Sequence, residues 1–403
     1  MPWSRGPVND RHAMIERYLD GWSKTELAEH FGVSWRCVHK WVERFEASGC
    51  DWISLEEISR RPHRSPRRTP ERIVKRLLRL KRKYKEGPAK LITFFNQKGV
   101  PPLAASTAGE ILKRHGLVRP RKRRRPSASP SKAPHLVIPG PGHTMTTDYK
   151  GQIRLGNGRY SYPLTMADPA SRYIFAIAGL PSTAGELARP VFERVFREFG
   201  VPEQILSDNG SPFCAAMSLG GLSELAKWWI RIGIRPVRIQ PGKPQQNGIH
   251  ERMHRTLKDK TAKPAAQTER AQQRRYDVFR EYFNQVRPHE SLGQKPPARF
   301  VKSFARPYPR RIPEIEYPSH FKVRSVRSNG EVKWKGLVFL SEVLRGERVG
   351  FEQLSEDRWA IYFGPVMLAH WDDRKRRVTR IQAVEDRAPQ LGEERDLRPG
   401  LGE

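Results

Sequence analysis

Acidic residues are scarce in this sequence relative to basic ones. Its 403 residues include 75 Lys and Arg but only 43 Asp and Glu, which gives a formal net charge of +32. An excess of this size repels itself in a compact fold and favours a polyanionic partner. Nucleic acid is the leading candidate for that partner, and an anionic membrane surface is the lesser one.

Long apolar runs and paired cysteines are also missing. No run approaches the roughly 20 residues of a membrane-spanning helix, and YIFAIAGL at 173–180 is among the longest. The N-terminal MPWSRGPVND lacks the apolar core of a secretory signal. The three cysteines (Cys37, Cys50 and Cys214) do not have the spacing of metal ligands. We therefore expect a cytoplasmic protein with free thiols and no membrane partner.

Residues 1–58 have the helical spacing of a helix-turn-helix DNA-binding domain. SKTELAEHFG begins with a capping box, Ser23 with Glu26, and ends on a glycine. The next helix, SWRCVHKWVERF, has an apolar stripe and a basic outer face. We expect the basic face to contact DNA through Arg36, His39, Lys40 and Arg44. A plain three-helix bundle with a solvated face is the alternative.

Two basic linkers flank a second helical unit. SRRPHRSPRR at 59–68 holds five arginines and no acid, and residues 118–142 are rich in basic residues, proline and serine. We expect both linkers to follow DNA phosphates, through Arg60, Arg61, Arg64, Arg121, Lys122, Arg123 and Arg124. A localisation signal is an alternative for the second linker. Residues 69–117 between them predict a winged-helix or helix-turn-helix-like DNA-binding domain, in which Thr107 and Glu110 form a capping box, or else a packing adaptor.

The rest of the chain predicts a multidomain α and α/β protein. Three strand-like segments within 143–180 are joined by turns and predict an antiparallel meander. The alternation of helices and strands up to 305 then favours a mixed five-stranded sheet with helices on it. Residues 306–384 alternate like strands and predict a small β-barrel or sandwich. The tail at 385–403 is polar, and we expect it to be flexible.

In a chain this basic, acidic residues within the predicted sheet need an explanation. Asp148 falls in the first strand, Asp208 directly after the fourth, and Glu251 in the first turns of a later helix. The first strand should be central and the fourth its parallel neighbour, so these carboxylates should converge. Converging carboxylates repel one another unless cations neutralise them. Oxygen ligands alone indicate Mg²⁺ or Mn²⁺, and two such ions per site would support phosphoryl transfer.

Each acid also has a structural alternative. Asp208 lies in Ser-Asp-Asn-Gly, which is good turn chemistry. Glu251 could pair with Arg255 one helical turn away, and Asp148 could lie on an exposed strand face. Asp168 is a fourth acid, and Pro169 after it favours a turn over a catalytic role.

The segment KPQQNGIHERMHRTLK surrounds Glu251 with possible DNA contacts. Its Pro/Gly-rich start lets the backbone approach DNA closely, and basic residues follow on the face of Glu251. The expected contacts are Lys243, Gln245, Gln246, Asn247, His254, Arg255 and Lys258. His254 is near enough to contact substrate or to orient Glu251, and a structural histidine is its alternative.

Three segments together resemble the Asp-Asp-Glu core of insertion-sequence transposases of the retroviral integrase superfamily: TMTTDYKG, ILSDNGSPF and PGKPQQNGIHERMHRTLK. NQVRPHESLGQKPPA resembles the signature that closes those cores, and GVSWRCVHKWVERF with SRRPHRSP is similar to the N-terminal region of the same group. The resemblance covers roughly residues 10–305. It implies a ribonuclease-H-like core over 143–305, in which Asp148, Asp208 and Glu251 are the catalytic metal ligands.

This sequence departs from the family pattern at two places. The segment 209–250 between Asp208 and Glu251 is longer than in many members. Thr146–Thr147 stand where a tryptophan often precedes the first aspartate. Neither departure removes a ligand, but the first makes the start of the Glu251 helix uncertain.

The resemblance also implies an activity and partners. The protein would bind the terminal inverted repeats of an element, cleave DNA to expose 3′-OH ends and join them to target DNA. It would act at least as a dimer, in association with the bacterial nucleoid. One rival interpretation is a catalytically silent DNA-binding protein, and another is a nuclease that hydrolyses DNA without joining it.

Overall fold

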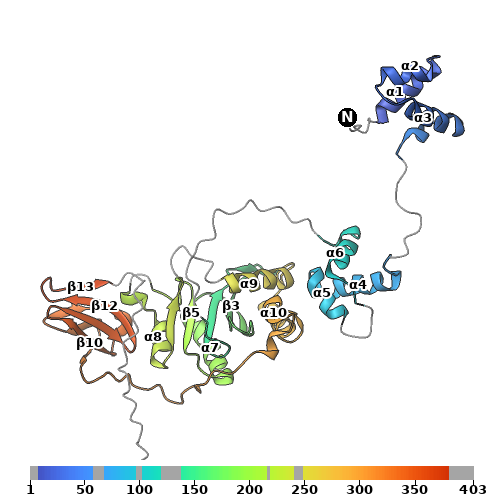
Figure 1. Ribbon diagram of the computed structural model, residues 1–403. Coiled ribbons are helices and arrows are strands. Elements are labelled where there is room, and N and C mark those ends of the chain that lie inside the picture. The colour runs from blue at the N-terminus through green and yellow to red at the C-terminus, as the bar shows by residue number, and fades with distance from the viewer. Residues whose placement is uncertain are drawn as a thin grey trace, which may run out of the picture. The chain divides into compact units, whose positions relative to one another are not determined.

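The computed structural model describes residues 8–57, 68–96, 102–118, 138–215, 218–239 and 248–380. The chain divides into two compact units, Met1–Lys75 and Arg76–Glu403 (Figure 1). Each unit has its own buried core.

The first unit is a small helical domain. Its elements are α1 (Val8–Leu19), α2 (Lys24–His30), α3 (Trp35–Ala47) and the short 3₁₀ helix η1 (Trp52–Leu55). The apolar stripe of α3 is buried at Val38, Trp41, Val42 and Phe45. The expected capping box is confirmed, because Ser23 Oγ accepts from the Glu26 amide while the Glu26 carboxylate accepts from the Ser23 amide.

Three helices follow: α4 (Glu71–Tyr84), α5 (Pro88–Phe95) and α6 (Ala105–Arg114). The described residues between 68 and 118 contain no strand, so they show no wing. The capping box expected at Thr107 and Glu110 is wrong, because α6 begins earlier, with Ala104 as its N-cap and no side-chain cap. Alanine is the best helix former, so the helix begins at Ala105, two residues before Thr107.

A mixed sheet forms the centre of the second unit. Its strands are β1 (Thr144–Tyr149), β2 (Ile153–Arg154), β3 (Tyr160–Ala167), β4 (Ile174–Leu180), β5 (Gln204–Ser207) and β6 (Arg235–Arg238). β4, β3 and β1 pair antiparallel in that order, and β5 and then β6 continue the sheet in parallel. The short β2 pairs with the start of β3. The predicted meander, with its first strand central and a parallel neighbour, is confirmed. The expected number of five strands is wrong, because the short β2 adds a sixth strand to the sheet.

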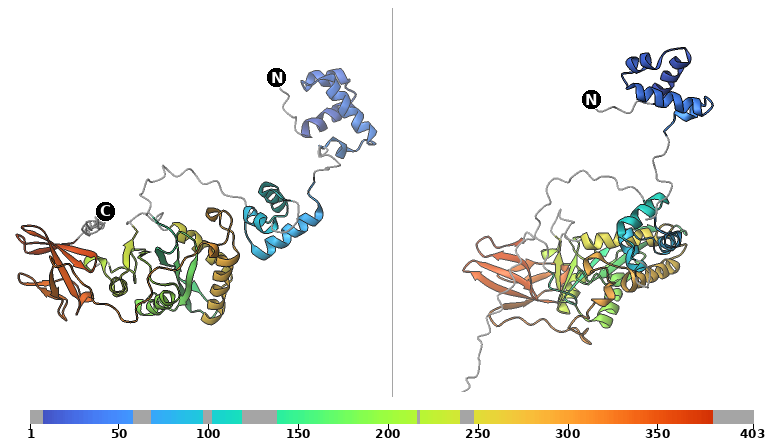
Figure 2. Two further views of the ribbon diagram at one scale, coloured as in Figure 1. Left: turned by 60° about the horizontal axis from the view of Figure 1, so that its bottom comes forward. Right: turned by 45° about the vertical axis from the view of Figure 1, so that its right-hand side comes forward.

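Helices cover both faces of this sheet, as Figure 1 and Figure 2 show. The helices are α7 (Gly185–Phe199), α8 (Glu224–Arg231), α9 (Gly248–Thr261) and α10 (Glu269–Glu281). Because side chains alternate along a strand, Leu164 and Met166 of β3 pack with α7 and α8, whereas Ala167 packs with α9 and α10. The candidate acids belong to the face that α9 covers.

The C-terminal region contains strands but no closed barrel among the described residues. The strands are β7 (Lys322–Ser325), β8 (Glu331–Lys333), β9 (Leu337–Phe339), β10 (Arg348–Ser355), β11 (Arg358–Phe363), β12 (Val366–Asp372) and β13 (Arg377–Arg380). Five form an open antiparallel sheet in the order β13-β12-β11-β10-β7, and β8 pairs with β9 apart from it. The barrel that we expected is not confirmed. Both edge strands are short and present exposed basic side chains, features that keep sheet edges from pairing.

Candidate metal and nucleic-acid site

Asp148 and Asp208 lie at the ends of adjacent parallel strands. In the register of β1 and β5, Thr144 is opposite Gln204 and Thr146 is opposite Leu206. Asp148 follows Thr146 by two residues, and Asp208 follows Leu206 by two, directly after β5. The sheet therefore brings the two aspartates to the same level on neighbouring chain segments.

The pKa of Asp148 depends in part on the charges of neighbouring carboxylates. Burial above all, and then the charges of Asp208 and Glu251, raise the pKa of Asp148 to about 7, although a backbone hydrogen bond from Tyr149 and the charge of Lys150 act in the opposite direction. Its side chain is only 18% exposed. The charges of Asp208 and Glu251 therefore act on Asp148, and a bound cation would relieve this repulsion.

Asp208 also has a local structural role. Its Oδ1 accepts a hydrogen bond from the Gly210 amide at 3.1 Å, and Asn209 Nδ2 donates to the Ile239 carbonyl at 2.9 Å, beyond the end of β6. Asp208 is therefore a turn residue as well, and this turn bond is made by Oδ1. Asp168 is a turn residue as expected, because it accepts from the Ala170 amide and is fully buried.

Glu251 lies in the first turn of α9 and is exposed, as are Arg255 and Lys258 on the same helix. Among the described residues, no three Asp, Glu, His or Cys side chains stand close enough to form a ready metal site. The donor chemistry nonetheless fits a hard cation, because Asp148 and Asp208 end neighbouring strands at the same level, the charge of Glu251 also acts on Asp148, and magnesium prefers oxygen ligands. Asp148, Asp208 and Glu251 are the residues that could hold it.

The structure places the His254 side chain in a different environment from the one expected. Its ring is buried, with Nε2 at 2.7 Å from Thr165 Oγ1 and Nδ1 at 3.6 Å from Asp148 Oδ2. This burial does not fit a direct DNA contact, and the ring faces Asp148, whereas we expected it to orient Glu251. The physical reason is that α9 lays this side of the helix on the sheet while Glu251 remains exposed.

Sequence reasoning missed the residues that accompany His254. His250 is also buried, with Nε2 at 2.5 Å from Thr165 Oγ1 and Nδ1 at 3.0 Å from Thr146 Oγ1. Burial lowers the pKa of His250 to about 3 and that of His254 to about 2, so both imidazoles are neutral. The i,i+4 spacing of the two histidines was a signal that they share one helix face.

The residues of α3 that were expected to contact DNA differ in exposure and in their partners within the protein. Arg36 and Lys40 are exposed, and His39 is half-buried. Arg44 donates to the Glu56 carbonyl at 2.9 Å, so it already has a structural partner. The other candidates lie outside the described residues: Arg60, Arg61, Arg64, Arg121, Lys122, Arg123, Arg124, Lys243, Gln245, Gln246 and Asn247.

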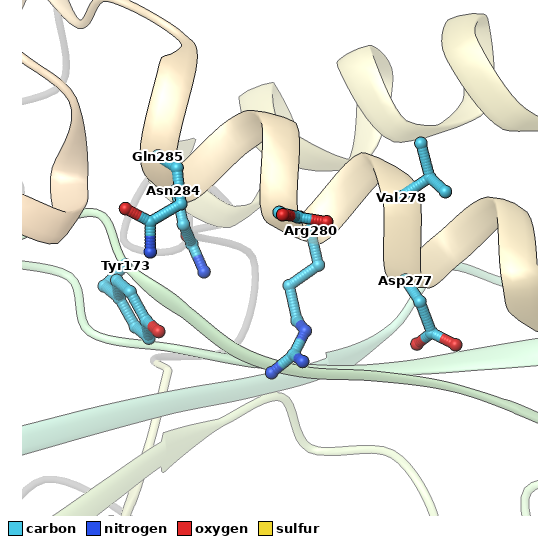
Figure 3. A pocket seen from close by; sticks show the side chains of 7 residues that line it. Tyr173, Asp277, Val278, Arg280, Asn284 and Gln285 are labelled. Atoms are coloured by element: carbon cyan, nitrogen blue, oxygen red, sulfur yellow. The ribbon is translucent and has the colours of Figure 1, made fainter.

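A separate pocket lies between α10 and the start of β4 (Figure 3). It is lined by Tyr173, Asp277, Val278, Arg280, Glu281, Asn284 and Gln285. Arg280 points across it toward the sheet and donates to the Phe175 carbonyl at 2.8 Å. None of the three candidate metal ligands lines this pocket, so we assign it no part in their chemistry.

Comparison with known families identifies the class of domain that these features form. Residues 139–244 and 232–297 match models described as the integrase core domain, and residues 8–51 match a homeodomain-like domain. The chain therefore contains an integrase core domain and an N-terminal homeodomain-like helix-turn-helix. The mixed sheet is the ribonuclease-H-like sheet of such a core.

The chain is also homologous to particular proteins of mobile elements and retroviruses. It is 29% identical over 187 residues to an uncharacterized 39.2 kDa protein of insertion element IS476 from Xanthomonas euvesicatoria, which covers 46% of this chain and 51% of that protein. It is 33% identical over 110 residues to the Pol polyprotein of feline endogenous virus ECE1, or 27% of this chain and 10% of the polyprotein. The chain thus spans about half or less of the length of these relatives.

Solved integrase structures have a limited overall similarity to this chain. The catalytic core domain of HTLV-2 integrase in complex with magnesium is 14% identical with a TM-score of 0.32, and covers 40% of this chain and 97% of that one. A simian T-cell lymphotropic virus intasome bound to a PP2A regulatory subunit is 16% identical with a TM-score of 0.37, and covers 72% and 97%. Both scores are low, so the family matches rather than these structures identify the core. None of the described helices is long and apolar enough to cross a membrane.

Proposed function

We propose that this protein is the transposase of an insertion sequence, with Asp148, Asp208 and Glu251 as its catalytic metal ligands. The observation that carries the proposal is the placement of Asp148 and Asp208 at the same level on paired strands of an integrase core domain, with Glu251 among the charges that act on Asp148. Outside a metal site, mutual repulsion beside a buried aspartate would only destabilise the fold.

The carboxylates would hold two Mg²⁺ or Mn²⁺ ions. When bound, such ions activate an attacking oxygen and stabilise the leaving one. The protein's own contribution is to position the DNA: Arg255 and Lys258, exposed on the helix of Glu251, would hold phosphates beside the site. Arg36 and Lys40 on α3 would bind the element ends.

Two transfers make up the reaction. In the first, water adds to a phosphorus atom at the element end, the P–O3′ bond breaks, and a 3′-OH is released. In the second, that 3′-oxygen bonds to a phosphorus atom of target DNA and displaces a target 3′-OH. Because two ends are joined to one target, the active form is at least a dimer on DNA, which also implies association with the nucleoid.

We also propose that the segments of the chain have different roles. Residues 1–58 and 69–117 would bind DNA, 59–68 and 118–142 would link the domains, and 143–305 would catalyse. Residues 306–384 would form an accessory β domain, followed by a tail at 385–403.

Strand-transfer assays with the variants Asp148→Asn, Asp208→Asn and Glu251→Gln test this function. Each variant should lose about a thousandfold or more of joining activity while binding end DNA as the wild type does. Asp259→Asn is the matched control, because Asp259 is an exposed acid on the same helix that pairs with Lys263. It should keep its activity. Wild-type joining by any of the first three variants would refute the assignment.

The reaction products of the wild-type protein distinguish a transposase from the two alternative functions, a nuclease and a catalytically silent DNA-binding protein. A transposase yields joined products, a nuclease yields cut ends without joining, and a silent DNA-binding protein yields neither in the presence of Mg²⁺ or Mn²⁺.

A further inference from the structure

A polar cluster is buried directly behind Asp148. Thr165 is the cross-strand partner of Asp148 on β3, and Thr146 precedes Asp148 by two residues, so all three side chains lie on the face that α9 covers. His250 and His254 enter this face one helical turn apart, and their rings meet edge to face with centroids 4.6 Å apart. Both histidines and both threonines are at most 4% exposed.

Six polar contacts join this cluster, but it has few hydrogens to donate. Thr165 Oγ1 meets both histidine Nε2 atoms, at 2.5 and 2.7 Å, and the Asp148 carbonyl at 2.9 Å. Thr146 Oγ1 meets His250 Nδ1 and the Ala167 carbonyl, both at 3.0 Å. The sixth contact joins His254 Nδ1 to Asp148 Oδ2 at 3.6 Å. Each hydroxyl and each neutral imidazole has one hydrogen to donate, so at most four contacts are hydrogen bonds at one time.

The position of His254 Nδ1 beside the Asp148 side chain favours one arrangement, with three hydrogen bonds and a longer contact of 3.6 Å to the carboxylate. A carboxylate accepts only, so it is stabilised where His254 carries its hydrogen on Nδ1. His254 Nε2 is then an acceptor, and Thr165 must donate to it. His250 then donates to Thr165 from Nε2, and Thr146 donates to His250 Nδ1. Every donor is used in one direction, from Thr146 through His250, Thr165 and His254 to Asp148.

The opposite tautomer of His254 has an unfavourable contact. With its hydrogen on Nε2, the Nδ1 lone pair would face the carboxylate oxygen in a buried, low-dielectric region. The two threonines could then donate to backbone carbonyls, as their distances also allow. That arrangement gives the Asp148 carboxylate no hydrogen from His254.

We propose that His254 is a positioning residue for Asp148, held by His250, Thr165 and Thr146 with its Nδ1–H directed at the carboxylate. The inference rests on the proposed function in that it takes Asp148 as a metal ligand. His254 does not touch the DNA. It orients the carboxylate through Oδ2, and the 3.6 Å separation makes this interaction electrostatic rather than a short hydrogen bond. Outer partners of metal ligands commonly contribute 10–100-fold to metal affinity.

Two substitutions separate orientation from simple packing. The amide nitrogen of Asn can occupy the position of Nδ1, so His254→Asn keeps a donor toward Asp148. The amide of Gln reaches the position of Nε2, so His254→Gln keeps the Thr165 contact and loses that donor. Both remove the ring, so a merely structural histidine would respond alike to the two changes.

Mn²⁺ binding to the full chain, measured by calorimetry, tests the proposal without reference to activity. We expect His254→Gln to weaken Mn²⁺ binding about tenfold or more and His254→Asn to stay within about threefold of the wild type. His289→Gln is the control, because His289 is another partly buried histidine, which contacts Arg287 and not an acid of the site. It should bind Mn²⁺ as the wild type does. Equal Mn²⁺ affinity in the Gln and Asn variants overturns the proposal.

A measurement on the wild type keeps the test decisive if the variants fold poorly. Nitrogen NMR of histidine-labelled protein saturated with Mg²⁺ should find the His254 hydrogen on Nδ1, and a hydrogen on Nε2 overturns the inference. If Asp148→Asn retains strand transfer, the proposed function itself fails. If Asp148→Asn loses strand transfer but His254→Gln binds Mn²⁺ normally, only the role of His254 fails.

Discussion

Asp208 combines a local and a distant interaction in one side chain. Its Oδ1 closes a turn on the Gly210 amide, while its charge raises the pKa of Asp148 on the neighbouring strand. The turn is visible in the Ser-Asp-Asn-Gly sequence, and the second interaction depends on the pairing of β1 with β5. Asp208 therefore shows that the turn and metal-ligand interpretations of one residue do not exclude each other.

We predict that Asp208→Asn and Asp208→Ala differ in stability although both lose strand transfer. Asn can still accept from the Gly210 amide and removes the charge beside Asp148, so the metal-free variant should be at least as stable as the wild type. Ala loses the turn bond, which costs about 1 kcal/mol. Urea unfolding in EDTA measures both. Equal destabilisation of the two variants would show that the turn bond does not contribute.

At the scale of the element, the same sequence spacing forms a capping box at the start of α2 but not at the start of α6. Ser23 and Glu26 form a complete capping box on α2. Thr107 and Glu110 have the same spacing, yet α6 begins before them at Ala105. The pattern requires an N-cap with extended backbone, and the residues upstream of Thr107 continue the helix instead.

This difference predicts opposite outcomes for two similar substitutions. Ser23→Ala should destabilise α2 by about 1 kcal/mol, because an amide at the helix start loses its acceptor. Thr107→Ala removes no cap and introduces a better helix former, so α6 should keep or gain stability. Hydrogen exchange of the α2 and α6 amides measures each locally. A comparable loss at both sites would contradict the helix start at Ala105.

At the scale of the whole molecule, one buried carboxylate connects distant parts of the Arg76–Glu403 unit. Glu86, between α4 and α5, is 6% exposed and lies 3.1 Å from Arg287 Nε and 3.2 Å from Lys260 Nζ. The Tyr282 hydroxyl also donates to it, at 3.0 Å. Lys260 belongs to α9, the helix that carries Glu251, so this cluster joins α9 to the helices before the core.

We predict that Glu86→Gln destabilises this unit by about 3 kcal/mol, because it leaves buried cations without their counter-charge. Burial opposes ionisation of Glu86, but Arg287, Lys260 and Lys90 together lower its pKa below 4.5. A lowered folded-state pKa means that the stabilisation is fully present above pH 4.5 and is lost as the pH falls through the folded-state value.

The free energy of unfolding at several pH values measures this effect. The difference between wild type and Glu86→Gln should be constant near neutral pH and should shrink below pH 4.5. Glu193→Gln is the control, because Glu193 forms only i,i+4 ion pairs along α7; it should change stability far less. A difference that grows on acidification would contradict the role of Glu86.

Local patterns in the sequence were enough to predict the elements and the order of the acids. Helical stripes, alternating strands and turn residues predicted the helix-turn-helix region and the meander with β1 at its centre, which the structure confirms. They did not predict the open C-terminal sheet, since whether edge strands pair depends on the twist and curvature of the complete sheet.

The sequence by itself therefore determined most of the helical, extended and turn segments, though not the start of α6, because these properties depend mainly on neighbours within a few positions. Only the tertiary structure decided the environments of single groups. His254 lies behind Asp148 because α9 packs on the Thr165 face, and Glu86 meets Arg287 across 201 positions of chain. Burial and charge at such sites arise from segments far apart in sequence, so they emerge only when the sheet register and helix packing are known.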